Sequence, residues 1–375
     1  MSARARGASV VGLAALVSVA VAVVTVATSA IAAAPTTPAV QPLAAATTTA
    51  SVTPSSSAPP TITVAAVGDM CFASSVRRLV NSKGPKAPFS STGKLLRAVD
   101  VTVGNLECAL SKRGHPVSGK TYTFEGPPSA VRGLAWAGFD FVALANNHAR
   151  DYGSKALLDT VKNLDARSIA HAGAGHDKKA AWRPAIIVRN GARIAFLSFS
   201  QIGPSSFRAT SSSSGTAYTM SSTAVVRAIK RAHAKADYVI VSYHWGVERD
   251  FGPTGTQVRF GRASVRAGAD LVLSHHPHVI QGVEFYRKGL IAYSLGNFVF
   301  SPGSENGHDT MVLSLTIGPR GIRNVVARAA HIDPYGRPVL AKGSTRTRIL
   351  KIIRRTSRGR GTHVTISGGV ARLRK

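Results

Sequence analysis

Acidic residues are scarce in this chain of 375 residues, which has 17 Asp and Glu against 47 Lys and Arg and a formal net charge of +30. A protein of this charge attracts polyanions. Nucleic acid is not expected as the partner, because the chain has no recognisable nucleic-acid-binding motif and begins like an exported protein. The remaining candidates are anionic cell-envelope polymers, teichoic-type phosphates, acidic capsule and lipid head groups. The alternative is a set of solvated basic faces without a partner.

Cysteine is almost absent, since the chain has only Cys71 and Cys108. Two cysteines in an oxidising compartment permit one disulfide, and two buried thiols are the alternative. A structural zinc site of the cysteine type is therefore not expected. A metal site built from carboxylate, amide and imidazole ligands requires no sulfur and suits Mn, Fe or Zn.

Long apolar runs are also missing, with one exception at the start of the chain. Arg4 and Arg6 precede an uncharged, Ala- and Val-rich stretch over 7–34. Its 28 residues exceed the ~7–15 of a signal peptide's apolar region and reach the ~20 needed to span a bilayer. Residues 1–34 are therefore predicted to be a signal peptide or, preferably, a membrane anchor. The preceding positive charges place the rest of the chain outside the cytoplasm, as a membrane-anchored or secreted protein.

The rest of the chain divides by composition. Residues 35–60 are almost wholly Ala, Thr, Ser, Pro and Val without a charge, which is typical of a flexible linker. Residues 61–335 alternate apolar strand-like runs with amphipathic helical segments, which predicts one α/β domain. Residues 336–375 form a basic C-terminal extension, and its last 35 residues contain 11 Lys and Arg and no acid.

Within the predicted domain, parallel βαβ pairing is expected from strands at 61–67 and 100–103 with a short helix at 94–99 between them. Further strands are predicted at 139–145, 169–171, 237–241 and 271–273, and helices at 127–137, 222–235 and 256–267. Two hairpins are predicted, at 184–199 around Asn190 and Gly191 and at 283–294 around Lys288 and Gly289.

One stretch, residues 271–282, contains three imidazoles directly after a strand. His275, His276 and His278 surround Pro277, which stiffens the turn, and alternate side chains of such a turn can share one ion. An isolated pair of histidines would more often be structural. Here, however, five predicted strands each end in oxygen or imidazole side chains, which share one edge of an open α/β sheet. These are Asp69, Asn105 with Glu107, Asn147 with His148, His244, and His276 with His278.

Six motifs in this order resemble those of the CapA family of poly-γ-glutamate capsule proteins, a branch of the calcineurin-like metallophosphoesterases. They are AVGDM at 66–70, GNLE at 104–107, NNHARDYG at 146–153, HWGVE at 244–248, HPHVIQG at 276–282 and YSLGNF at 293–298. The resemblance implies a four-layer α-β-β-α sandwich. It also implies an anchored, extracytoplasmic protein that works with an anionic polymer and with other capsule-synthesis proteins.

The resemblance also assigns roles to individual residues. It implies one or two divalent ions (Mn, Fe, Zn or Ca) and makes His148 a candidate acid near the leaving group. Asp151 is predicted chiefly to cap the following helix and is kept with His148 as a catalytic candidate. The ligands that it implies are Asp69, Asn105, Glu107, Asn147, His244, His276 and His278.

One departure from the family pattern affects the expected activity. Phosphoesterases of this kind usually have Asp-x-His on the first strand, whereas the third position here is Cys71. A metal-dependent hydrolase or transferase, acting on a phosphoester or a γ-glutamyl amide, is the preferred hypothesis. The alternative from another class is an anchored, non-catalytic binding or assembly factor for the polymer.

Overall fold

The computed structural model describes residues 58–375. The predicted anchor or signal peptide at 1–34 and nearly all of the linker at 35–60 lie outside the described residues. Among the residues that are described, no helix is both long and apolar enough to cross a membrane.

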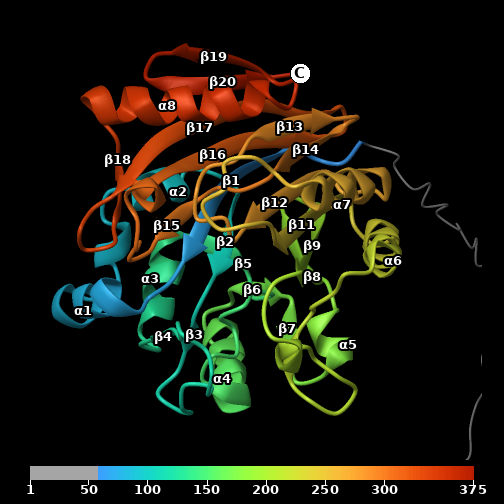
Figure 1. Cartoon of the computed structure of the whole chain (residues 1–375). Helices are drawn as coiled ribbons and strands as arrows, with labels where there is room; N and C mark the ends of the chain where they lie inside the picture. The colour runs from blue at the N-terminus through green and yellow to red at the C-terminus, as the bar shows by residue number, and fades with distance from the viewer. Residues whose placement is uncertain (1–57) are drawn as a thin grey trace, which may run out of the picture. The chain divides into compact units, whose positions relative to one another are not determined.

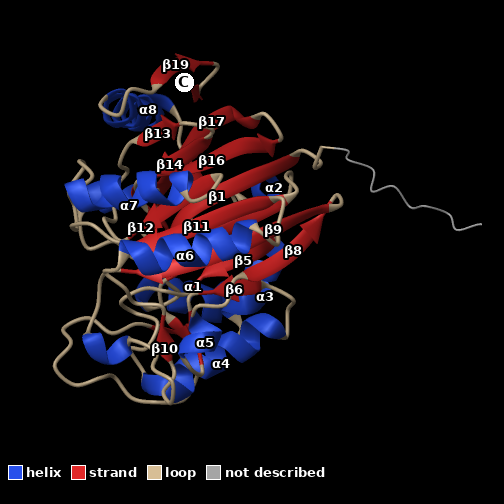
Figure 2. Cartoon of the chain, turned by 90° about the vertical axis from the view of Figure 1, so that its right-hand side faces the viewer, coloured by secondary structure: helices blue, strands red, loops and turns tan. Residues whose placement is uncertain are grey.

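Two large β-sheets form the centre of the molecule (Figures 1 and 2). The larger has the order β19-β20-β17-β16-β1-β2-β5-β6, with β15 beside β1 and β18 beside β17. Its strands are β1 (Ile62–Met70), β2 (Val101–Leu106), β5 (Phe139–Ala143), β6 (Ala170–Ala172), β15 (Asn297–Val299), β16 (Asp309–Gly318), β17 (Gly321–Ile332), β18 (Pro338–Leu340), β19 (His363–Ser367) and β20 (Val370–Arg374).

The second sheet has the order β13-β14-β12-β11-β9-β8. Its strands are β8 (Ala185–Arg189), β9 (Ala192–Ser200), β11 (Tyr238–His244), β12 (Leu271–His275), β13 (Val283–Tyr286) and β14 (Gly289–Ala292). Both hairpins expected from the sequence are present, as β8–β9 and β13–β14. Two small ribbons complete the strands, β3 (Ala109–Leu110) with β4 (Glu125–Gly126) and β7 (Ala174–Gly175) with β10 (Gly215–Thr216).

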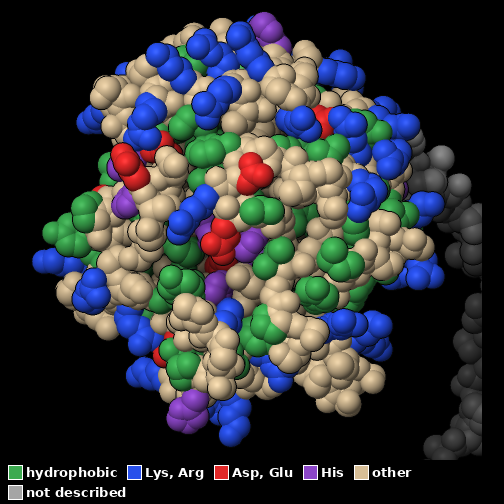
Figure 3. Space-filling model, in the orientation of Figure 1, with side chains coloured by type: hydrophobic (Ala, Val, Ile, Leu, Met, Phe, Trp, Pro, Cys, Tyr) green, Lys and Arg blue, Asp and Glu red, His purple; other side chains and the backbone are tan. Residues whose placement is uncertain are grey.

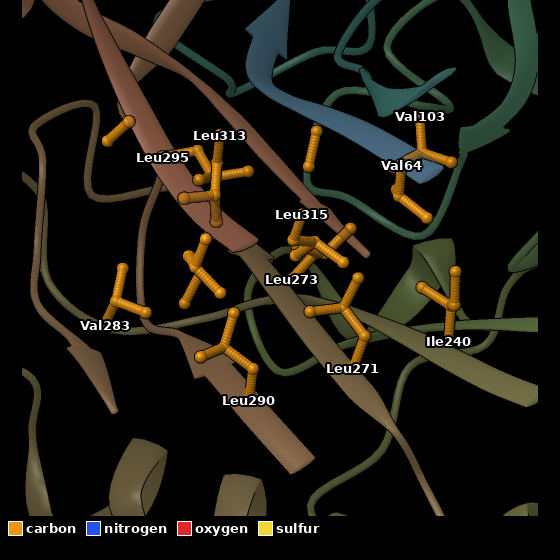
Figure 4. Close-up of a cluster of buried hydrophobic side chains, with 14 of the residues drawn as sticks. Val64, Val103, Ile240, Leu271, Leu273, Val283, Leu290, Leu295, Leu313 and Leu315 are labelled. Carbon is orange, nitrogen blue, oxygen red and sulfur yellow. The ribbon is translucent and has the colours of Figure 1, made fainter. Parts of the chain in front are cut away.

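The two sheets pack face to face through apolar side chains. Alternate residues of a strand point to opposite faces, and β1 follows this rule. Val64 and Ala66 join a core with Ile240 and Leu271 of the second sheet, whereas Ala65 and Val67 join a different core under helices. Figure 4 shows the first of these cores between the strands. Because both faces of β1 are buried, its sequence reads as a continuous apolar run.

Helices cover the outer faces of both sheets. The larger sheet is covered by α1 (Ser74–Lys83), α2 (Gly93–Leu96), α3 (Ala130–Ala137) and α4 (Gly153–Asp165), and the second sheet by α5 (Lys178–Ala181), α6 (Ser222–His233) and α7 (Gly255–Arg266). The second view shows α6 and α7 lying across the second sheet (Figure 2). The expected α/β class and the four layers are therefore confirmed.

The basic C-terminal segment is folded onto the larger sheet. Strand β20 pairs with β17, and α8 (Gly343–Arg358) packs beside β17 and β19. Ile349, Leu350 and Ile353 of α8 are buried in the same core as the two facing sheets. Because its apolar residues recur every three or four positions, one face of this arginine-rich helix is buried and the other is exposed.

Candidate metal centre

The carboxyl ends of parallel strands from both sheets meet at one edge of the sandwich. In the larger sheet β1 pairs with β2 so that Asp69 lies opposite Asn105, and in the second sheet β11 pairs with β12 so that His244 lies opposite His275. Gly68 makes this approach possible, since a Cβ there would lie 1.9 Å from the carbonyl oxygen of Gly296. The edge therefore collects side chains that are far apart in the sequence, as the strand-end pattern predicts.

The turn after β12 is held in an unusual backbone conformation. His276 has a φ of +93° and His278 a φ of +58°, values that non-glycine residues adopt at a cost of ~1–3 kcal/mol each. The backbone N–H of His276 donates to Asp69 Oδ2 at 3.1 Å. The ring of His276 lies 4.9 Å from that of His244 and 5.8 Å from that of His278, measured between centroids. The turn therefore places the rings of His276 and His278 near that of His244 at the end of β11.

Two sets of three side chains could each hold a metal ion, and Glu107 belongs to both. One set is Glu107, His276 and His278, and the other is Asp69, Glu107 and His244. Within each set the ligand atoms all lie within 4.8 Å of one another. A carboxylate shared between two sets is the arrangement needed to bridge two ions, although either set alone provides for one.

The state of Glu107 tests whether a cation fits this space. Its side chain is fully buried, and no donor among residues 58–375 forms a hydrogen bond to either carboxylate oxygen, although His244 Nε2 lies 3.3 Å from Oε1. Burial and the negative charge of Asp69 raise the pKa of Glu107 well above its usual value. A buried carboxylate without donors is costly, and an adjacent cation removes that cost. The residues present therefore fit a divalent metal.

The neighbouring groups are in the protonation states that a metal requires. Burial alone would raise the pKa of Asp69, but the adjacent imidazoles of His275 and His278 hold it well below its usual value. Burial lowers the pKa of His244 well below its usual value and lowers that of His276 to about 3. Both rings are therefore neutral near pH 7 and have a free lone pair for a metal.

The two asparagines predicted as ligands have different surroundings. Asn147 Oδ1 lies 2.7 Å from His244 Nε2, so it borders the same space. Asn105 instead uses both ends of its amide, because its Nδ2 donates to Asp69 Oδ1 at 2.9 Å and its Oδ1 accepts from Asn146 Nδ2 at 3.1 Å. Asn105 therefore orients Asp69 in this structure, and its role as a ligand stays a prediction.

His148 and Asp151 form a buried pair beside the cluster. His148 Nδ1 lies 2.6 Å from Asp151 Oδ2, and the ring packs against Phe124 with centroids 4.3 Å apart. The expectation that Asp151 caps α4 is wrong. The N-cap of α4 is Tyr152 without a side-chain hydrogen bond, and the Asp151 carboxylate accepts instead from the backbone N–H of Phe124 at 2.8 Å. Tertiary partners have replaced the local cap.

Three further side chains at the site were not among the predicted ligands or catalytic residues, although His275 is one of the three imidazoles of the stretch 271–282. Lys120 Nζ contacts the Asp151 carboxylate, donates to the carbonyl oxygen of Asn147 at 2.6 Å and lies 3.0 Å from His148 Nδ1. His275 Nδ1 lies 3.2 Å from Asp69 Oδ1, and Asn297 Oδ1 lies 2.8 Å from His278 Nδ1. His275 and Asn297 stand in the motifs at 271–282 and 293–298. Nothing in the sequence around Lys120 marks it.

Comparison with known proteins assigns the chain to a family. Residues 63–302 match the family described as bacterial capsule synthesis protein PGA_cap. This chain belongs to the PGA_cap family. The expected relationship to CapA is thereby confirmed, and the family's description links it to capsule synthesis.

Several curated relatives of this PGA_cap protein carry related names. The capsule biosynthesis protein CapA of Bacillus anthracis is 32% identical over 267 residues, which cover 69% of this chain and 65% of that protein. The PGA biosynthesis protein CapA of Bacillus subtilis strain 168 is 30% identical over 262 residues, or 69% of each. A probable polyglutamine synthesis accessory protein of Mycobacterium tuberculosis is 28% identical over 245 residues, covering 61% and 64%. The chain thus spans about two thirds of these relatives.

Solved structures are more distant from this PGA_cap protein. A putative 5′-nucleotidase from Staphylococcus aureus aligns with a TM-score of 0.46 and 15% identity, over 76% of this chain and 55% of that one. The NAD nucleotidase of Haemophilus influenzae aligns with a TM-score of 0.39 and 12% identity, over 79% and 63%. Similarity at this level carries no inference about activity.

The cysteine at the departure from the phosphoesterase pattern is a buried thiol. Cys71 and Cys108 are both free and buried, so the disulfide alternative is wrong. Burial and the neighbouring Cys108 raise the pKa of Cys71 well above its usual value, which disfavours the thiolate that would bind a metal. Cys71 belongs to neither of the two sets that share Glu107.

Proposed function

We propose that this protein is a metal-dependent hydrolase or transferase that acts on an anionic polymer of the cell envelope, such as poly-γ-glutamate or capsule. The observation that carries the proposal is the fully buried Glu107 carboxylate, which lacks hydrogen-bond donors and is common to both candidate ligand sets. A fold stabilised without an ion would be expected to avoid such a group.

The proposed division of labour follows from the contacts at the site. One or two ions held by Asp69, Glu107, His244, His276 and His278, with Asn147 beside them, would polarise a substrate oxygen and activate water. His148 supplies the proton transfer, because its Nδ1 faces Asp151 and leaves Nε2 as the atom that exchanges a proton. Lys120 and Phe124 hold this pair in place.

The polymer is inferred from charge and from the relatives. The net charge of +30 favours an anionic substrate. Two relatives are named for capsule or PGA biosynthesis and another for polyglutamine synthesis. We also propose that the chain is exported and held at the membrane or secreted, on the basis of the charge and apolar pattern of residues 1–34.

A second candidate function is binding or assembly of such a polymer without catalysis. The observation that favours it is the exposed basic face of α8, which Lys351, Arg354, Arg355 and Arg358 line without an acid. Figure 3 shows Lys and Arg side chains concentrated over the part of the molecule where Figure 1 places α8.

Metal analysis separates the two functions. The purified protein should contain Mn, Fe or Zn by elemental mass spectrometry, and Glu107→Ala should lose it, whereas the exposed control Glu305→Ala should retain it. A screen of phosphoester, peptide and γ-glutamyl substrates with added Mn, Zn or Ca should then give activity that Glu107→Ala lowers at least ~100-fold. Equal metal content in the two variants would refute the catalytic proposal and leave the binding function.

A further inference from the structure

A basic groove of about 550 Å³ lies at the other end of β1 from the metal centre. It is lined by side chains around the β13–β14 turn, around the β16–β17 turn and on β20. Arg323 in this lining contacts Thr61, directly before β1, with a distance of 3.4 Å from Nη2 to Oγ1. Thr61 is eight residues from Asp69, so the groove lies roughly 26 Å from the metal centre along the strand.

Cations reach the groove from three separate parts of the chain. The β13–β14 turn supplies Arg287 and Lys288, and the β16–β17 turn and the start of β17 supply Arg320 and Arg323. Strand β20 adds Arg372 and Arg374, and Lys375 follows directly after it; all three are exposed. No acidic side chain lines the groove. The fold itself has brought like charges together.

These cations are not used to hold the described part of the protein together. None of these seven cations forms an ion pair with a carboxylate of residues 58–375, whereas Arg262 pairs with Glu284 and Arg348 pairs with Asp309. Like charges that line one groove repel one another, and an anion that binds between them relieves this repulsion. The floor between them is apolar and includes Ile322 and Leu373.

We propose that this groove binds a segment of a linear polycarboxylate, apart from the metal centre. Carboxylates on such a chain would pair with the basic rim, and its methylene groups would lie on the apolar floor. A concave groove of this volume fits a single extended chain better than the flat surface of a bilayer. The choice of polymer rests on the proposed function.

The separation of groove and metal centre gives the groove a role. A chain longer than roughly 26 Å could be held in the groove while another part of it lies at the metal centre. The second contact is then intramolecular, which raises the occupancy of the site for long chains and not for short ones. The groove would therefore select polymer over free glutamate or short oligomers.

Equilibrium binding of fluorescent poly-γ-glutamate to the full chain tests this inference. The test variant is Lys288→Gln/Arg320→Gln/Arg372→Gln, with one neutralised cation from each part of the groove. All three residues are exposed and make no side-chain hydrogen bonds in the structure, so folding should be unaffected. The matched control is Arg78→Gln/Lys83→Gln/Lys94→Gln, which removes the same charge from exposed positions on α1 and α2.

We expect the groove variant to bind polymer about tenfold more weakly than the control variant at low salt, with the difference shrinking as salt rises. Equal affinities of the two variants would overturn the proposal. So would a groove variant that binds polymer normally but loses binding to vesicles rich in phosphatidylglycerol, since the occupant would then be a lipid surface. No turnover is measured, so a metal-free wild-type protein would refute the catalytic function while leaving this result intact.

Discussion

The two ends of β1 carry opposite kinds of polar chemistry. At the carboxyl end, Asp69 and its partners are buried, close together and held by a strained turn. At the amino-terminal end, the cations of the basic groove are exposed and lie on two turns, at the start of β17 and at the end of β20. The two ends therefore differ chiefly in burial: the polar side chains are buried at the carboxyl end of β1 and exposed at its amino-terminal end.

This difference predicts how each end responds to change. A buried ligand set in low dielectric should respond to single substitutions with large effects and little dependence on salt. An exposed basic groove should respond in small, additive steps that salt removes. Three predictions test or sharpen that contrast.

The largest effect is expected for His148→Gln. The substitution removes the proton-transfer group but none of the proposed ligands, so metal-activated turnover should fall by about 100- to 10,000-fold. Metal content and polymer affinity should stay at the wild-type level. Turnover assays paired with elemental analysis check this, and loss of metal together with activity would instead make His148 a ligand.

A moderate effect is expected at Asp270, which precedes β12 at the same end as the groove. Burial raises the pKa of Asp270 to about 6, while its Oδ2 accepts from the N–H of Val239 at 2.8 Å. The folded state therefore holds this proton more tightly than the unfolded state does. The contribution of Asp270 to stability is therefore fully present below about pH 4, and about 3 kcal/mol of it should be lost as the pH rises through 6.

The variant Asp270→Asn isolates this contribution. Denaturant titrations at pH 4, 5, 6 and 7 should give it a flatter stability profile than the wild type, because an amide does not titrate. Parallel profiles for the two proteins would mean that Asp270 is not the group that titrates.

The smallest effect concerns the strained turn at the carboxyl end. His276→Gly and His276→Ala both remove the ring and should both lose metal. Because glycine adopts a φ near +93° without strain, the metal-free glycine variant should be more stable than the alanine variant by about 1 kcal/mol. Urea titrations of both variants with chelator present measure this, and an alanine variant of equal stability would show that the turn is relaxed.

The convergence of the strand ends could be predicted because it follows from periodicity and topology. Apolar runs ending in Asp69, Glu107, His244 and His276 predict parallel strands, and parallel strands place their carboxyl ends together. The structure brings these four side chains into the two candidate ligand sets. The convergence of these strand ends does not depend on how the loops fold.

Other features of the site depend on contacts that no local pattern encodes. Lys120 lies in a long excursion between β3 and β4, and only tertiary packing brings its ammonium group to His148 and Asp151. Asp151 precedes a helix, so its sequence context favours a cap, but its carboxylate instead contacts Lys120, the backbone N–H of Phe124 and the nearby ring of His148. His275 is the last residue of a strand, and only the facing sheet shows that its ring meets Asp69.

The helix and strands of the C-terminal segment could not be predicted because of its composition. A run rich in arginine without acids is typical of a basic extension. The i, i+4 spacing of Ile349 and Ile353, which indicates a helix with one buried face, is a weak signal among so many cations. The β16–β17 hairpin was missed for a related reason, since the arginines of β17 interrupt its alternation.

The position of β1 in its sheet determines when, during synthesis, the larger sheet can fold around it. Ile62 pairs with Ile317, and Asp69 pairs with Asn297, so the first strand of the domain is fixed by some of the last strands to be synthesised. Pairing between such distant segments is slow, and a nascent chain lacking β15 and β16 has no stable partner on that side of β1. The candidate metal centre therefore assembles only after most of the domain has been translated, so a prematurely terminated chain would contain Glu107 without the other candidate ligands around it.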